Sequence, residues 1–208
     1  MPETNVLLSL GAVFTLFFVT LGPLKLLGPF AQMTHELDDT TIRKIALRAF
    51  ALALIGVLAG SFIGQALAHN WHISISAMLL TGGIIFFLVG LRQVLDQYEP
   101  AHHATPPLPA EPLAAAMKVA FPLVVTPYGI ASLIAMLANS HDGARTGEVV
   151  AILVGVMVLN LLAMLFARKI MAGITLVALQ ILGAVLGVLQ VALAVEIILR
   201  ALGDLKIL

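Results

Sequence analysis

The chain has 208 residues, of which 61% are hydrophobic and 11% are charged, and its mean hydropathy is +1.08. Soluble domains carry about 25% charged residues, so this composition predicts an integral membrane protein. The formal net charge is zero, which argues against nucleic acid as a partner, and the lack of cysteine excludes disulfides and thiol chemistry. The N-terminal residues lack the basic region of a cleavable signal peptide, so we expect the first apolar segment to be retained.

Six apolar segments are long enough to cross a bilayer, because a spanning helix needs about 20 mainly apolar residues. They cover approximately residues 6–32, 45–68, 74–95, 113–138, 147–167 and 173–202. The sequence therefore predicts an all-α transmembrane protein of six helices, with a single membrane domain over residues 1–208.

The first segment is interrupted by two Gly-Pro pairs, Gly22-Pro23 and Gly28-Pro29, and by Lys25. Proline removes a backbone donor and clashes with the preceding turn, so we expect this helix to be broken or re-entrant over residues 22–29. A charge at membrane depth is costly unless it is paired or hydrated. Lys25 would therefore contact an anionic substrate group or act as a gating charge, or it would extend to the cytoplasmic interface.

The second segment carries Gly56, Gly60 and Gly64 at intervals of four residues. Such a stripe of small residues lets another helix approach closely. It predicts close packing within the chain, and the alternative is a homo-oligomer through this face.

Residues 98–112 contain five prolines and lie near the midpoint of the chain, so we expect an extended cytoplasmic linker. The fourth segment then repeats the theme of the first, because Pro122, Pro127 and Gly129 interrupt it and the polar residues Thr126 and Tyr128 lie at the interruption. Residues 1–97 and 113–208 would thus form two three-helix repeats. An odd number of spans in each half makes the second repeat inverted.

Broken segments in corresponding positions of two inverted halves point to a transporter site near the membrane midplane. Two independently kinked helices are the alternative explanation. The residues expected to line a substrate site are Gly22, Pro23, Lys25, Gly28, Pro29, Pro122, Thr126, Pro127, Tyr128 and Gly129.

Polar residues of the last two segments have simpler explanations. Asn160, Gln180 and Gln190 are expected to form hydrogen bonds between helices. Glu196 precedes Arg200 by four residues, which favours a surface ion pair, although a protonatable carboxylate that couples transport to a proton gradient is the alternative.

The sequence contains none of the motifs that would indicate an enzyme. We find no HExxH, no P-loop, no Rossmann glycines and no nucleophile elbow, and the histidines give no ligand set. We therefore expect neither catalysis nor a cofactor or bound metal. Lysine and arginine are more frequent in the loops after the first, third and fifth segments, which predicts that both termini lie outside.

Several motifs resemble those of the MarC family of six-span bacterial inner-membrane proteins. They are the first-helix run Gly22-Pro23-Leu24-Lys25-Leu26-Leu27-Gly28-Pro29-Phe30, the third-helix pair Gly82-Gly83, the fourth-helix run from Pro122-Leu123 to Gly129-Ile130, and the tail glycines Gly183 and Gly187. Lys25 stands where the family motif usually has glycine. The resemblance implies a relative of the SnatA-type neutral amino-acid transporters, near the LysE exporter superfamily, in the bacterial inner membrane.

The residues and the resemblance together predict a secondary transporter for a small solute such as an amino acid or small organic anion. The solute would cross by alternating access between the repeats, with a proton or sodium ion as a candidate partner. The alternative is a protein that binds or flips a membrane lipid, with Lys25 at the anionic headgroup. A structural subunit of a larger complex is a third hypothesis.

Overall fold

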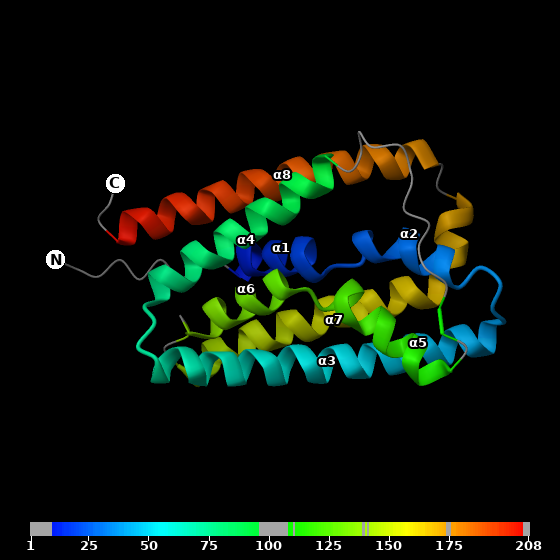
Figure 1. Ribbon diagram of the computed structural model, residues 1–208, viewed down its shortest axis with the longest axis horizontal. Coiled ribbons are helices and arrows are strands. Elements are labelled where there is room, and N and C mark those ends of the chain that lie inside the picture. Colours follow the sequence, from blue (N-terminus) through cyan, green and yellow to red (C-terminus); the bar gives the residue numbers. More distant parts are fainter. Residues whose placement is uncertain are drawn as a thin grey trace.

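The computed structural model describes residues 10–95, 108–109, 111–138, 140, 142–173 and 176–205. Within them the protein is entirely helical, and its long helices run along one common axis (Figure 1). The elements are α1 (Leu10–Leu21), α2 (Leu24–Met33), α3 (Asp39–Asn70), α4 (Ile75–Leu95), α5 (Pro112–Lys118), the π-helical segment η1 (Val119–Val124), α6 (Pro127–Ala138), α7 (Gly143–Gly173) and α8 (Leu176–Asp204). The predicted all-α class is therefore confirmed for the described residues.

The described helices provide five or six membrane spans. α1 and α2 together give one span, Val13–Met33, and α3, α4, α7 and α8 give four more. The segments Pro112–Val124 and Gly129–Leu137 form the sixth if they are counted as a single span bent by 66°. The predicted linker, residues 98–112, lies mostly outside the described residues.

The outer surface of the bundle carries large apolar side chains. Ile55 on α3 is 66% exposed and Ile181 on α8 is 61% exposed, whereas Phe17, Phe30 and Leu153 are fully buried between helices. A water-soluble helical protein would cover such positions with polar residues. The exposed apolar surface therefore fits a protein whose helices face lipid.

The helices alternate in direction, and the loops divide between two ends of the bundle (Figure 1). α3 and α6 end on the left of this view, where α4 and α7 begin, and α8 also ends there. The α2–α3 turn and the end of α7 lie on the right. The first turns of α3 carry Arg43, Lys44 and Arg48, and the last turns of α7 carry Arg168 and Lys169.

The two long helices α3 and α7 begin with the same kind of cap. Asp38 caps α3 by accepting a hydrogen bond from the backbone N of Thr41 (3.0 Å), and Asp142 caps α7 by accepting one from the backbone N of Arg145 (2.6 Å). Asp142 follows Asp38 by 104 residues, and α3 and α7 have 32 and 31 residues. Hydrogen bonds from Thr41 and Thr40 hold the pKa of the Asp38 carboxyl well below its usual range.

Most of the helix contacts join the first half of the chain to the second, and they include contacts of α3 with α7 and of α4 with α6. α7 packs against α1 and α2, whereas α3 packs against α5, η1 and α6. α4 and α8 pack against each other along most of their length, at the top of Figure 1. The first span thus rests on the fifth, the fourth rests on the second, and the third pairs with the sixth.

The glycine stripe of α3 faces the fourth span of the same chain. A Cβ atom at Gly56 would overlap the ring of Phe121, and one at Gly64 would overlap Ile134. A Cβ atom at Gly60 would be 3.9 Å from Ile130. The stripe therefore serves packing within the chain. Residues of η1 and α6 occupy this face of α3, through which a homo-oligomer was the alternative.

Gly83→Ala is expected to lower the melting temperature, because the α4–α8 contact is close at Gly83. A Cβ atom there would lie 2.8 Å from Cγ1 of Ile198 and 3.2 Å from Cγ2 of Ile197, so the helices would have to separate. Overpacking of this kind costs about 1–3 kcal/mol. Thermal unfolding in detergent would measure the change.

Gly82→Ala is the matched control, because a Cβ atom at Gly82 meets no described atom within 4 Å. Alanine is favoured over glycine inside a helix by about 1 kcal/mol, so this variant should be neutral or more stable. Equal melting temperatures for the two variants would contradict the close α4–α8 contact.

Candidate functional site

The break in the first span is shorter than the sequence suggests. Gly22 and Pro23 separate α1 from α2, but α2 resumes at Leu24 and continues through Gly28 and Pro29. The prediction of an unwound segment over residues 22–29 is therefore wrong in its extent. Pro29 removes one backbone hydrogen bond from α2, and glycine before it avoids the clash of a Cβ atom with the proline ring.

Gly22 fixes the position of this break. A Cβ atom at Gly22 would overlap the carbonyl oxygen of Phe18 in the last turns of α1. Backbone cannot move away as the end of a flexible side chain can, so the chain passes from α1 to α2 at this point only with glycine.

The second break lies between η1 and α6. Phe121 adopts an extended conformation within η1, which also contains Pro122. Thr126 then caps α6, because its Oγ1 accepts a hydrogen bond from the backbone N of Gly129 (3.3 Å), and Pro127 occupies the first position of the helix. This combination starts a new helix directly after the bend.

The two breaks are in contact with each other. The Thr126 hydroxyl donates a hydrogen bond to the carbonyl oxygen of Thr20 (3.5 Å), immediately before the first break. Gly129 packs against Leu21 so closely that a Cβ atom there would overlap the leucine side chain. Residues more than 100 positions apart in sequence therefore form one polar junction inside the bundle.

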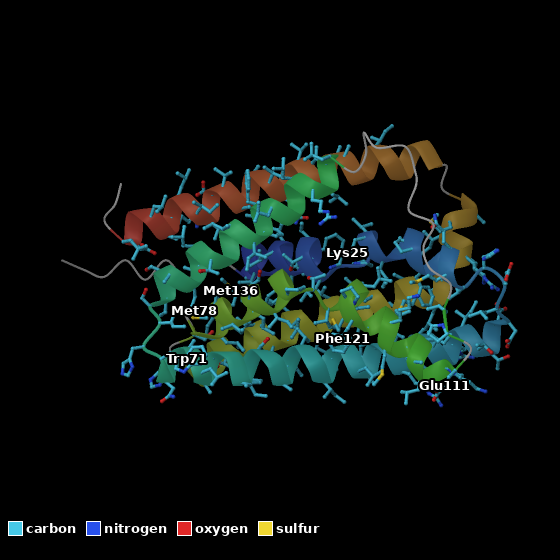
Figure 2. The ribbon with its side chains drawn as sticks, viewed as in Figure 1. Lys25, Trp71, Met78, Glu111, Phe121 and Met136 are labelled. Carbon is cyan, nitrogen blue, oxygen red and sulfur yellow. The ribbon has the colours of Figure 1, made fainter. Side chains whose placement is uncertain are left out.

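Lys25 belongs to this junction. Its ammonium group donates a hydrogen bond to the Thr20 carbonyl, the same acceptor that Thr126 uses, and the side chain is partly buried. Figure 2 shows Lys25 where α1 meets α2, far from both ends of the bundle. The side chain thus turns back across the break rather than toward the polar turn after α2.

Asn160 on α7 also contacts the junction, at the first break. It is 1% exposed, and its Nδ2 donates a hydrogen bond to the carbonyl of Leu21 (2.5 Å). Its Oδ1 is buried and has no hydrogen-bond partner among the described residues. The sequence marks Asn160 only as a polar residue within a span, since the partner lies 139 residues away.

Gln190 on α8 lies beside the first break. It is 2% exposed, and its Nε2 donates to the carbonyl of Phe86 on α4 (3.4 Å). A small cavity of about 20 Å³ lies between α8 and the first break, lined by Phe18, Val19, Gly22, Leu24, Lys25, Leu186 and Gln190. This volume is about that of one water site.

Tyr128 and Glu196 are two further residues predicted for the site or for coupling. The side chain of Tyr128 lies outside the described residues, although its backbone is in α6. Glu196 is exposed and forms an ion pair with Arg200 (2.7 Å) on the surface of α8. It lies six residues beyond Gln190, which is about 9 Å along a helix. Among the described residues, no group of three or more His, Cys, Asp or Glu could hold a metal ion.

An all-helical bundle of about six apolar spans, with two spans broken where they touch, defines a multi-pass integral membrane protein. The family model described as "MarC family integral membrane protein" matches residues 7–205, and the chain belongs to the MarC family. Recognition of this family from the motif residues is confirmed.

Two relatives have related sequences. The chain is similar to the UPF0056 membrane protein MJ1677 of Methanocaldococcus jannaschii, with 27% identity over 192 residues, 91% of this chain and 93% of the relative. It is also similar to a UPF0056 membrane protein of Buchnera aphidicola subsp. Baizongia pistaciae, with 26% identity over 88 residues, 42% of this chain and 44% of the relative. No solved structure matches the chain.

Proposed function

We propose that this protein is a secondary transporter that moves an amino acid or small organic anion across the membrane. The observation that carries the proposal is the hydrogen bond from the Lys25 ammonium to the carbonyl of Thr20 at a helix break deep in the bundle. A cation at this depth is expensive, and such residues usually mark a solute or ion pathway.

The polar groups of the junction are complementary to an amino acid. Lys25 supplies a positive charge for a carboxylate. The carbonyls of Thr20 and Leu21 and the buried Oδ1 of Asn160 supply acceptors for an ammonium group. A small organic anion would use Lys25 alone.

Transport requires the junction to open. The cavity of about 20 Å³ beside Lys25 is several times too small for an amino acid. Since Leu186 and Gln190 form its outer wall, separation of α8 from the first break would enlarge it. Alternating access would open this wall toward one side of the membrane at a time.

The arrangement of the two halves supports an inverted repeat that performs this movement. If the first span corresponds to the fourth, the second to the fifth and the third to the sixth, then the contacts of α7 with α1 and α2 correspond to those of α3 with α5, η1 and α6, and the α4–α8 contact corresponds to itself. The α4–α6 contact departs from this pattern, because no contact of similar extent joins α8 to the first span among the described residues. Side-chain clamps correspond as well. Arg168 of α7 donates to the carbonyl of Thr34 after α2 (2.5 Å), and Gln65 of α3 donates to that of Leu137 in α6 (3.0 Å).

The basic residues gathered around the α2–α3 turn favour that end as the cytoplasmic one in the bacterial inner membrane. Both termini would then be periplasmic. We also propose that the protein is not an enzyme and needs no cofactor.

A solute screen tests the proposal. The purified protein would first be examined by thermal shift with amino acids, small organic anions and soluble lipid headgroups, and the stabilising solutes would then be tested for uptake into proteoliposomes. We expect an amino acid or organic anion to stabilise the protein and to move only when the protein is present. Movement of labelled lipid between leaflets, without movement of any solute, would instead favour the lipid-flipping alternative.

A further inference from the structure

A second cavity lies far from the two breaks, at the end of the bundle where α3 begins and α7 ends. It has a volume of about 550 Å³. Its lining consists of Thr34, Asp39, Ile42, Arg43 and residues 164–169 of α7. We propose that this cavity binds the headgroup of an anionic phospholipid.

The charges of the lining favour an anion. Three basic side chains, Arg43, Arg168 and Lys169, face one carboxylate, Asp39. Asp39 is already paired with Arg168 (3.1 Å). Arg43 and Lys169 are exposed and form no ion pair or side-chain hydrogen bond with another described residue. The cavity therefore offers two positive charges that the described residues leave uncompensated.

Arg168 connects α7 to the α2–α3 turn beside this cavity. Its guanidinium donates hydrogen bonds to the carbonyls of Thr34 (2.5 Å), His35 (3.0 Å) and Leu37 in the α2–α3 turn. The end of α7 is thereby fixed to the beginning of α3, so Arg43 and Lys169 face the cavity from two helices whose relative position is set. A fixed spacing between the two helices lowers the conformational entropy that is lost when an anion binds between them.

The surroundings indicate a lipid rather than a soluble anion. Ile42, Met164, Leu165 and Phe166 contribute apolar side chains to the same lining as the charged residues. Leu47 follows Arg43 by one turn of α3 and is 51% exposed, and Leu162 precedes Phe166 by one turn of α7 and is 44% exposed. Acyl chains can therefore lie along the exposed apolar side chains of α3 and α7 while the phosphate contacts Arg43 and Lys169. Basic pockets between spans bind lipid headgroups in this way.

The test compares lipids and matched variants. Delipidated protein in mixed micelles would be titrated with dioleoyl-phosphatidylglycerol, with dioleoyl-phosphatidylcholine or with inorganic phosphate, and the melting temperature and bound lipid (by native mass spectrometry) would be measured. We expect phosphatidylglycerol alone to raise the melting temperature and to remain bound. The double variant Arg43→Gln/Lys169→Gln should weaken this binding about tenfold or more, since each basic residue near a membrane surface contributes about 1 kcal/mol.

Lys44→Gln/Arg48→Gln is the matched control, because both residues are exposed on the same end of α3 and neither lines the cavity. It removes the same charge and should retain at least most of the binding. An equal loss in both double variants would show general attraction to a basic surface, and equal stabilisation by inorganic phosphate would show a soluble-anion site. Either result, or unchanged binding in Arg43→Gln/Lys169→Gln, would overturn the proposal. None of these measurements depends on solute transport.

Discussion

Lys25→Ala is expected to reduce solute transport by about 10- to 150-fold or more while the protein stays folded. The variant removes the positive charge that we assign to the solute carboxylate, and a charged hydrogen bond to a solute in a water-poor site is worth about 1.5–3 kcal/mol or more. The ammonium also donates to the Thr20 carbonyl. Loss of that single hydrogen bond within a membrane should lower stability by about 1 kcal/mol or less.

The measurement is the initial rate of solute uptake into proteoliposomes, together with the melting temperature of each variant. Lys25→Arg keeps the charge and should retain part of the transport, whereas Lys25→Met keeps the length of the side chain without the charge and should behave as Lys25→Ala does. Unchanged uptake in Lys25→Ala would remove Lys25 from the solute site and leave it with a structural role at the break.

Gly22→Ala is expected to have the largest effect on stability of any glycine variant in the described chain. The added Cβ atom would overlap the carbonyl oxygen of Phe18, and the backbone would have to move in order to accommodate it. That movement would displace the carbonyls of Thr20 and Leu21, which Lys25, Thr126 and Asn160 use as acceptors. We expect destabilisation of about 3 kcal/mol or more.

The corresponding fall in melting temperature is roughly 6–12 °C for a chain of this size, and poor recovery of folded protein would agree with it. Gly155→Ala on α7 is the control, because Gly155 is exposed and a Cβ atom there meets no described atom within 4 Å. It should be neutral or stabilising. A Gly22→Ala variant as stable as Gly155→Ala would show that the first break tolerates a side chain.

Most of the fold could be predicted because hydropathy and proline report on local physics. Each predicted span overlaps a helix of the structure, and the interruptions at Gly22-Pro23 and at residues 122–127 lie where the helices break. The extent of the first break could not be predicted. Whether a helix survives at Pro29 depends on the packing of Leu26, Leu27 and Phe30, which are all buried, and hydropathy does not report such packing.

The candidate site was only partly visible in the sequence. Lys25 and Thr126 are conspicuous because they are polar residues beside prolines. For Asn160 and Gln190 the sequence predicts only hydrogen bonds between helices. Their partners, Leu21 and Phe86, could not be predicted because they are distant in the sequence. In the sequence, Arg168 is only one of the basic residues in the loop after the fifth segment. Its contacts with the α2–α3 turn join residues more than 125 positions apart, and they exist only in the folded chain.

The Thr20 carbonyl has a consequence for how the two halves of the protein would communicate. Lys25 from the first half and Thr126 from the second half donate to this one oxygen. If the proposed solute drew the Lys25 ammonium away, Thr126 would be the remaining side-chain donor to this oxygen, and the contact between the halves would become stronger. By linkage, a movement that separates Thr126 from Thr20 would then weaken solute binding by the same factor by which the bound solute disfavours that movement. The Thr20 carbonyl oxygen would thus couple the solute contact of the first half to the position of the second half.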